Sequence, residues 1–110
     1  MKFNVVHTDN FERELKRLAK KHRSIKEDLR SLITRLEEDP KQGRSIGRNC
    51  YKIRMAIASK GKGKSGGARI ITHVYVVQKT IFLLSIYDES DQEGISDKEL
   101  EMILRLLNTP

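Results

Sequence analysis

The spacing of apolar residues changes from helical to extended near the middle of the chain. Before Pro40, apolar side chains recur at intervals of three and four, as at Phe11, Leu15 and Leu18, which places them on one side of a helix. From Tyr51 onward, apolar positions alternate with polar ones, which is typical of a strand with one buried face. The pattern therefore predicts helices followed by a sheet.

Signals in the N-terminal part divide its helical region into two helices. Residues Lys2–Val6 are expected to form a short strand, and helical spacing follows over Phe11–Ala19. Ser24 and Glu27 have the spacing of a capping box, which predicts that a second helix begins there. Pro40 ends this helix, because proline disfavours helical backbone in the residue before it. The two helices are expected to form a hairpin with one shared apolar side.

The C-terminal part is expected to contain three strands and a last helix. The polar segments 41–49 and 59–67 are interpreted as loops, and Ser96 with Glu99 repeats the capping box. The expected order is β-α-α-β-β-β-α in a single domain over residues 1–110. This order predicts an α+β fold, with two N-terminal helices on one face of a small antiparallel sheet and a C-terminal helix. The expected strands are Tyr51–Ala58, Ala68–Val77 and Thr80–Tyr87.

The alternation within the strands assigns each side chain to one of the two faces of the sheet. The helices are expected to cover the face that carries Ile53, Met55, Val74 and Leu84. The opposite, open face is expected to present Lys52, Arg54, Arg69, His73, Ser85 and Tyr87. A cationic sheet face with an aromatic side chain is a plausible surface for binding RNA.

Positive charge is concentrated in the same region. Residues 51–79 contain seven Lys and Arg residues and no Asp or Glu, whereas the last thirty-one residues are acidic overall. Such a block attracts polyanions such as nucleic acid. A solvated surface of a basic protein explains the block equally well, and charge alone leaves both interpretations open.

The sequence gives no sign of secretion or of membrane insertion. Cys50 is the only cysteine, which excludes an internal disulfide and fits a reducing cytosol. Met1–Asn10 lacks the apolar run of a signal peptide, and the longest apolar runs are too short to cross a bilayer as helices. We therefore expect a cytoplasmic protein without a membrane partner.

The connector 59–67 is rich in glycine and lysine. Its end, Gly63-Lys64-Ser65, is similar to the end of a Walker A loop, but Ala58 occupies a position that requires glycine. A strand, and not a helix, is expected to follow, so nucleoside triphosphate binding is excluded. The glycines would let Lys60, Lys62 and Lys64 approach an RNA backbone. The alternative is a hairpin loop with no binding role.

No metal site or other cofactor is expected. The three histidines, His7, His22 and His73, fall on separate elements without a second ligand at metal-binding spacing. His73 is left with two interpretations, because it either lines the open face as an RNA contact or packs there.

Two segments of the chain together resemble the RelE superfamily of type II toxins. They are Cys50–Met55, followed by Gly66–Ile71. The longer string that also includes Ala58–Arg69 and Leu83–Tyr87 looks like the HigB-type branch. The resemblance implies a compact sheet-and-helix fold and a partner antitoxin. We expect that antitoxin to cover the basic face or to displace the last helix.

The resemblance also implies an activity, which is the inhibition of translation by an mRNA interferase. This endoribonuclease would cleave messenger RNA in the ribosomal A site without a metal, through attack of the RNA's own 2′-hydroxyl on the neighbouring phosphate. By position, Lys52 and Arg54 would contact the scissile phosphate, and Arg69 would stabilise its developing charge. Tyr87 would stack on a base or assist proton transfer. Acidic residues follow Tyr87 where RelE-like toxins often have basic ones, so the general acid is not assigned.

Two other functions remain open at this stage. One is a ParE-like inhibitor of DNA gyrase, since one fold supports different activities. The other is a nucleic-acid-binding module without catalysis. The clustering of Lys52, Arg54 and Arg69 favours the nuclease. In that case Arg54 and Arg69 should lie on the solvent side of adjacent strands, where replacement with alanine leaves the core intact.

Overall fold

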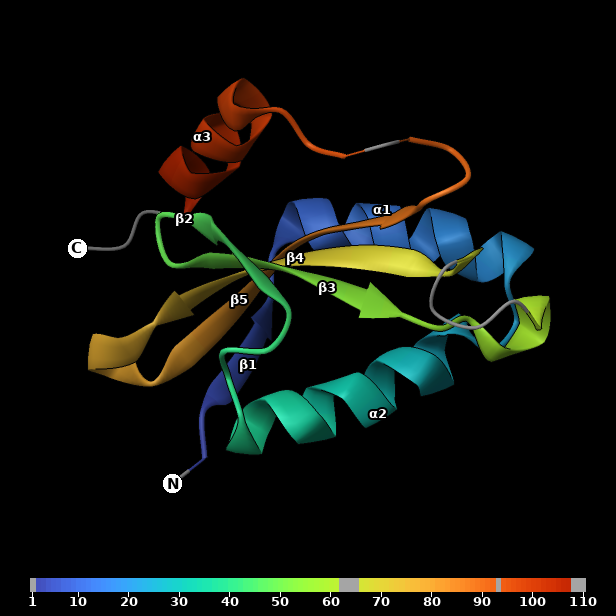
Figure 1. The fold of residues 1–110 in the computed structure, drawn as a ribbon, viewed down its shortest axis with the longest axis horizontal. Helices are drawn as coiled ribbons and strands as arrows, with labels where there is room; N and C mark the ends of the chain where they lie inside the picture. The colour runs from blue at the N-terminus through green and yellow to red at the C-terminus, as the bar shows by residue number, and fades with distance from the viewer. Residues whose placement is uncertain (1, 62–65, 93, 108–110) are drawn as a thin grey trace.

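The computed structural model describes residues 2–61, 66–92 and 94–107. Within them, three helices accompany one five-stranded sheet, whose strand order is β1-β5-β4-β3-β2 (Figure 1). The elements are β1 (Asn4–His7), α1 (Asp9–Lys21), α2 (Ile25–Glu38), β2 (Arg44–Gly47), β3 (Cys50–Met55), β4 (Ala68–Tyr75), β5 (Thr80–Asp88) and α3 (Asp97–Leu106). The expected α+β fold is thereby confirmed.

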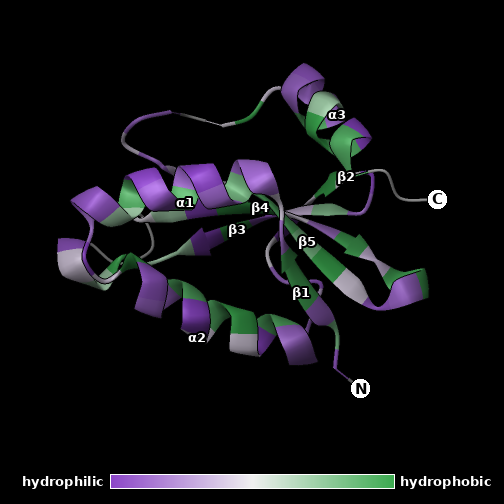
Figure 2. Ribbon diagram, turned by 180° about the vertical axis from the view of Figure 1, so that it is seen from behind, coloured by the Kyte–Doolittle hydropathy of each residue, from purple (hydrophilic) through white to green (hydrophobic). Residues whose placement is uncertain are grey.

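The helices divide between the two faces of the sheet. The hydrophobic sides of α1 and α2 turn toward one face and form the larger core with it, around Phe11, Leu32 and Ile70 (Figure 2). The shorter α3 packs on the opposite face through Leu100, against Ile71 and other residues of β3–β5. The face expected to be open is therefore partly covered by the last helix.

The sheet is mixed, and the expectation of a purely antiparallel sheet is wrong at one pair. β1 runs parallel to β5, with Asn4 opposite Thr80 and His7 opposite Leu83. The other neighbouring strands are antiparallel. Parallel neighbours need a long connection, and here the whole helical hairpin and the other three strands separate β1 from β5 along the chain.

β2 lies in the segment that was interpreted as a polar loop. It pairs with β3 through a tight turn, in which both Arg48 and Asn49 have positive φ, 56° and 60°. This conformation matches the twist of a two-residue hairpin. Polarity alone gave no sign of this strand, because most of its side chains are exposed at the edge of the sheet.

A bulge in β5 moves one apolar side chain to the other face. Ile71 pairs with Ser85 whereas Thr72 pairs with Leu83, so Leu84 is an extra residue in the ladder. Leu84 consequently packs in the α3 core, and its expected place under the helical hairpin is wrong. The expected open position of Ser85 is also wrong, because the residue is buried.

Side chains of α1 complete the edge of β5 beyond the end of β1. The Asn10 amide donates to the Leu84 carbonyl at 2.9 Å. The Glu14 carboxylate accepts from the Ser85 hydroxyl at 2.9 Å and from the Ile86 N–H at 3.2 Å. Burial raises the pKa of Glu14, and the hydrogen bonds from Ser85 and Ile86 partly offset this rise. The helix thus satisfies strand groups that would otherwise lack partners.

Only one of the two expected capping boxes forms. The Ser96 hydroxyl accepts from the Glu99 N–H at 3.1 Å, and the Glu99 side chain returns to the Ser96 backbone. The Ser24 hydroxyl instead donates to Asp28 at 2.8 Å and accepts from the Ser59 N–H at 2.8 Å. A tertiary contact with the segment after β3 has replaced the local cap.

Replacing Gly43 with alanine is expected to destabilise the fold more than the same change at Gly47. Both glycines have φ of +88°, which costs an alanine about 1–2 kcal/mol. At Gly43 the new methyl group would also lie 2.4 Å from the Lys52 carbonyl oxygen, whereas no atom lies within 4 Å at Gly47. Urea denaturation should show an additional loss of about 1–3 kcal/mol for Gly43→Ala. Equal losses of stability for Gly43→Ala and Gly47→Ala would contradict the close approach of Gly43 to the Lys52 carbonyl.

Candidate active site

Three basic side chains of the expected site come together on the sheet face that also carries α3. Arg54 of β3 pairs in register with Arg69 of β4, which pairs in turn with Tyr87 of β5. Lys52 lies two residues before Arg54, so its side chain points to the same face. The alternation along the strands therefore predicted correctly that these four residues share one face of the sheet. Arg54 is exposed and Lys52 is half-buried.

Arg69 is buried, and its expected position in solvent is wrong. Only 3% of the residue is exposed. Its guanidinium donates to the Ala68 carbonyl at 3.2 Å and forms an ion pair with Glu89. Glu89 directly follows β5, and its N–H donates to the Gly67 carbonyl at 3.2 Å, next to the Ala68–Asp88 pair of the β4–β5 ladder. Strand alternation predicts the face of a residue and not whether a neighbouring side chain covers it.

A small cleft is built around these cations. It has a volume of about 100 Å³ and is lined by Arg44, Lys52, Arg54, Arg69 and Glu89. Four cations surround one carboxylate, and such an arrangement suits a bound phosphate whose charge grows during a reaction. Sequence reasoning missed Arg44, because it lay in the expected loop. Its register opposite Lys52 brings it into the cleft.

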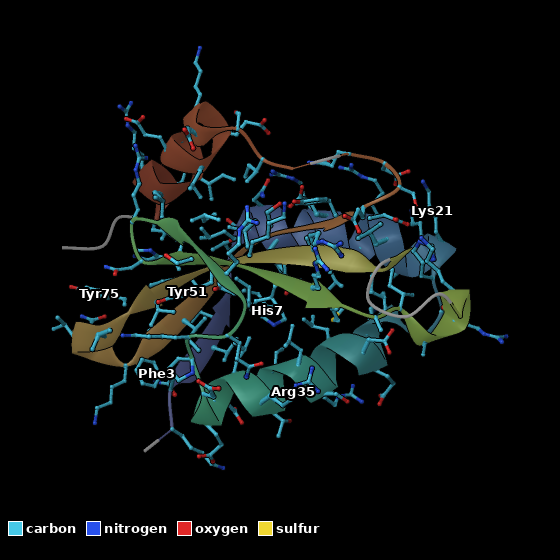
Figure 3. The ribbon with its side chains drawn as sticks, viewed as in Figure 1. Phe3, His7, Lys21, Arg35, Tyr51 and Tyr75 are labelled. Atoms are coloured by element: carbon cyan, nitrogen blue, oxygen red, sulfur yellow. The ribbon has the colours of Figure 1, made fainter. Side chains whose placement is uncertain are left out.

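A larger cleft shares three of these cations. It has a volume of about 370 Å³, and it is lined by Arg35 together with the apolar side chains of Leu32 and Ile53. Figure 3 labels Arg35 on α2. Arg44, Lys52 and Arg54 line both clefts. The two clefts therefore form one cationic surface that runs from the sheet toward α2. Its apolar floor offers a place for a nucleobase beside a bound phosphate.

Tyr87 lies beside the small cleft with its ring covered. The residue is 4% exposed, and its hydroxyl has no hydrogen-bond partner among the described residues. A Cβ at Gly94 would lie 3.7 Å from the Lys52 ammonium and 3.9 Å from this hydroxyl. Burial raises the pKa of Tyr87, Arg69 opposes that shift and Glu89 adds to it, so the hydroxyl stays protonated at neutral pH. The ring and the hydroxyl of Tyr87 are therefore both covered, and the residue borders the cleft without lining it.

The three lysines of the connector do not form one described patch. Lys60 folds inward, where its ammonium lies 3.1 and 3.2 Å from the Asp88 carboxylate oxygens and 3.3 Å from the Ser90 hydroxyl. His22 contacts the same carboxylate at 3.0 Å. Lys62 and Lys64, which were also expected to bind RNA, lie outside the described residues.

Replacing Lys60 with alanine is expected to lower stability more than RNA binding. The change leaves the buried Asp88 carboxylate with less compensation, at a cost of about 1–3 kcal/mol. Lys62→Ala and Lys64→Ala should instead weaken RNA binding modestly and reduce its salt dependence. Urea denaturation and binding titrations over a salt series test this difference. If Lys60→Ala behaves like the other two, its ion pair is not structural.

His73 packs at a distance from the cleft. Its ring stacks on Phe82 with centroids 6.4 Å apart, and its Nδ1 lies 3.5 Å from the Cys50 sulfur. Burial lowers the pKa of His73 and raises that of Cys50 to about 11. His73 lies four positions beyond Arg69 along β4, which corresponds to roughly 13 Å. His73 was expected either to contact RNA or to pack on the sheet face. Its contacts with Phe82 and Cys50 fit the packing interpretation.

The described residues also bear on metal and membrane binding. Among residues 2–61, 66–92 and 94–107, no group of three or more His, Cys, Asp or Glu side chains is placed to hold a metal ion. None of the helices in these ranges is long and apolar enough to span a bilayer.

Comparison with known proteins identifies the chain. Residues 9–109 match the family model described as RelE toxin of the RelE/RelB toxin–antitoxin system. The small α+β protein with a cationic cleft is thus a toxin of the type II toxin–antitoxin class. It belongs to the RelE family.

Solved structures support the same fold. A double arginine-to-alanine mutant of the Escherichia coli toxin RelE in the free state aligns with a TM-score of 0.63 at 17% identity, covering 97% of this chain and 99% of that one. RelE in the intact E. coli RelBE toxin–antitoxin complex aligns with a TM-score of 0.60 at 18% identity, covering 78% of this chain and 95% of that one. At this identity the likeness concerns the fold.

Proposed function

We propose that this toxin is a metal-independent endoribonuclease that cleaves messenger RNA on the ribosome. The observation that carries the proposal is the small cleft, in which Arg44, Lys52, Arg54 and Arg69 converge. By the family resemblance, Lys52 and Arg54 were expected to contact the scissile phosphate, and Arg69 was expected to stabilise its developing charge. A site that binds one phosphate with four cations can stabilise the extra charge of a pentacoordinate phosphorus.

The proposed reaction needs little from the protein beyond positioning and charge. The 2′-hydroxyl of the RNA attacks the adjacent phosphorus, and the 5′-oxygen of the next nucleotide leaves. Lys52 and Arg54 hold the non-bridging phosphate oxygens, and Arg69 stabilises the charge that develops on them. Tyr87, whose hydroxyl lies on the same side of Gly94 as Lys52, assists proton transfer.

We propose a cognate antitoxin as the protein partner of this toxin. The E. coli RelE structures include an intact RelBE complex and a RelE mutant bound to an antitoxin RelBc peptide. For this chain, such a partner would cover the cationic cleft, or it would displace α3 and uncover the sheet face beneath that helix. We also propose a cytoplasmic location, because ribosomes and messenger RNA are found in the cytoplasm. Membership in the HigB-type branch is likewise part of the proposal.

The decisive experiment is a cleavage assay with purified toxin, messenger RNA, and either intact ribosomes or none. We expect cleavage only with ribosomes, at positions in the A site. Cleavage of free RNA at the same rate would remove the ribosome from the proposal. No cleavage in either case, together with inhibition of gyrase supercoiling, would establish the ParE-like alternative. RNA binding without either activity would establish a non-catalytic module.

A further inference from the structure

Among the described residues that line the small cleft, Glu89 is the one carboxylate. It forms an ion pair with the buried Arg69, while its own side chain remains 38% exposed. The carboxylate is thus held at the phosphate-binding cations and is still accessible from solvent.

The backbone on both sides of Glu89 is fixed. Its N–H donates to the Gly67 carbonyl at 3.2 Å. The preceding residue, Asp88, is buried in the ion-pair cluster with Lys60 and His22. A proton acceptor must be held close to one geometry to be effective, and these contacts supply that restraint.

A carboxylate in a phosphate site needs an explanation, because it repels the substrate. If Glu89 served only to compensate the charge of Arg69, it would weaken the binding of the phosphate that Arg69 is placed to stabilise. The other three cations, Arg44, Lys52 and Arg54, offset this repulsion. A carboxylate so placed can do what none of the cations can, which is to accept a proton.

We infer that Glu89 is the general base of the cleavage reaction, an inference that rests on the proposed ribonuclease function. Glu89 takes the proton of the 2′-hydroxyl as the bond between O2′ and phosphorus forms. The bond between phosphorus and O5′ breaks, and the leaving O5′ takes a proton from the Lys52 ammonium, which has three N–H donors and can contact a non-bridging oxygen at the same time. The products are a 2′,3′-cyclic phosphate and a 5′-hydroxyl, and a return of the proton from Glu89 to Lys52 through solvent completes the cycle.

The first test compares Glu89→Gln with wild type on ribosome-bound messenger RNA. The amide keeps the size of the side chain and can still accept a hydrogen bond from Arg69, but it is not a base. We expect the single-turnover cleavage rate to fall a hundredfold or more, in the range typical of a lost general base. Binding of a messenger RNA with a 2′-deoxy residue at the cleavage site should be unchanged or tighter. Circular dichroism verifies folding.

Glu101→Gln provides a matched control. Glu101 is also a partly exposed glutamate paired with arginine, Arg105, but it lies on α3 outside the cleft. This variant should cleave at the wild-type rate. If Glu89→Gln fails to fold, Glu89→Asp keeps the charge and withdraws the carboxylate by one methylene. The aspartate variant should then cleave at least about tenfold more slowly at unchanged binding.

A modified substrate separates the base from the acid. A 5′-bridging phosphorothiolate has a leaving group that needs no proton. It should raise the cleavage rate of Lys52→Ala, which then lacks only its phosphate contact, and leave Glu89→Gln slow. Restoration of Glu89→Gln by this substrate would assign Glu89 to the acid step and overturn the inference.

The remaining outcomes are also decisive. A Glu89→Gln toxin that cleaves like wild type overturns the inference. One that cleaves faster and binds tighter would show that Glu89 competes with RNA for Arg69, which overturns it as well. Absence of cleavage by the wild type would instead reject the proposed function itself.

Discussion

Replacing Arg69 with alanine is expected to lower the rate of messenger RNA cleavage by a hundredfold or more and to destabilise the fold. The rate falls because a cation aimed at the developing phosphate charge is lost, by analogy with the removal of an oxyanion donor. The stability falls by about 2 kcal/mol, because a buried side chain and the partner of Glu89 are lost together. Arg69→Lys should restore little activity, since lysine cannot form the planar bidentate contact.

Arg54→Ala is the matched comparison for Arg69→Ala. Arg54 faces Arg69 across the β3–β4 pair but is exposed, so its replacement should change the free energy of unfolding by only about half a kcal/mol. The cleavage rate should nevertheless fall by a similar factor. Single-turnover cleavage and urea denaturation of both variants separate the two effects. If both proteins fold and cleave like the parent, the assignment of the cleft as the active site is wrong.

Replacing Asp88 with asparagine is expected to produce a large loss of stability, about 3 kcal/mol at neutral pH. The buried carboxylate is the common partner of Lys60 and His22, and its loss leaves the Lys60 ammonium without compensation. Asp91→Asn, an exposed carboxylate in the same segment, should have little effect. Urea denaturation at pH 7 measures the difference. Equal stability of the two variants would mean that the ion-pair cluster contributes nothing.

The same residue predicts how stability depends on acid. Burial alone would raise the pKa of Asp88, but the Ser90 N–H and the Lys60 ammonium lower it more, to about 2. Because the folded pKa lies below the unfolded one, this contribution of about 2 kcal/mol is present above pH 4 and is lost as the pH falls toward 2. The stability gap between wild type and Asp88→Asn should therefore narrow between pH 4 and pH 2. A constant gap would contradict the low pKa.

The candidate site could be predicted from the sequence to the extent that it depends on strand alternation. Lys52, Arg54 and Arg69 share a face because each lies on a strand whose period of two continues without interruption. The sheet face predicted for Leu84 was wrong, because a bulge adds a residue to β5 at that point. The prediction also missed Arg44, whose edge strand has too few buried side chains to leave an apolar pattern.

The charge pattern was a less reliable guide than the alternation. Lys60 of the lysine-rich connector was expected to contact RNA, yet it is turned inward to Asp88, 28 residues further along the chain. The acidic segment after β5 was set aside as a departure, yet its Glu89 lines the basic cleft. Opposite charges that are distant in sequence find each other through the fold, and composition alone cannot pair them.

The sequence by itself determined the order of helices and strands except for the edge strand β2, the α+β class and the face on which Lys52, Arg54 and Arg69 lie. These features follow from local periodicity, which each segment carries independently of the others. Only the tertiary structure decided that β1 joins β5 in parallel, that Arg69 is buried and that Glu89 covers it. Those features depend on contacts between segments that are distant in the chain, and no local pattern encodes which distant groups will meet.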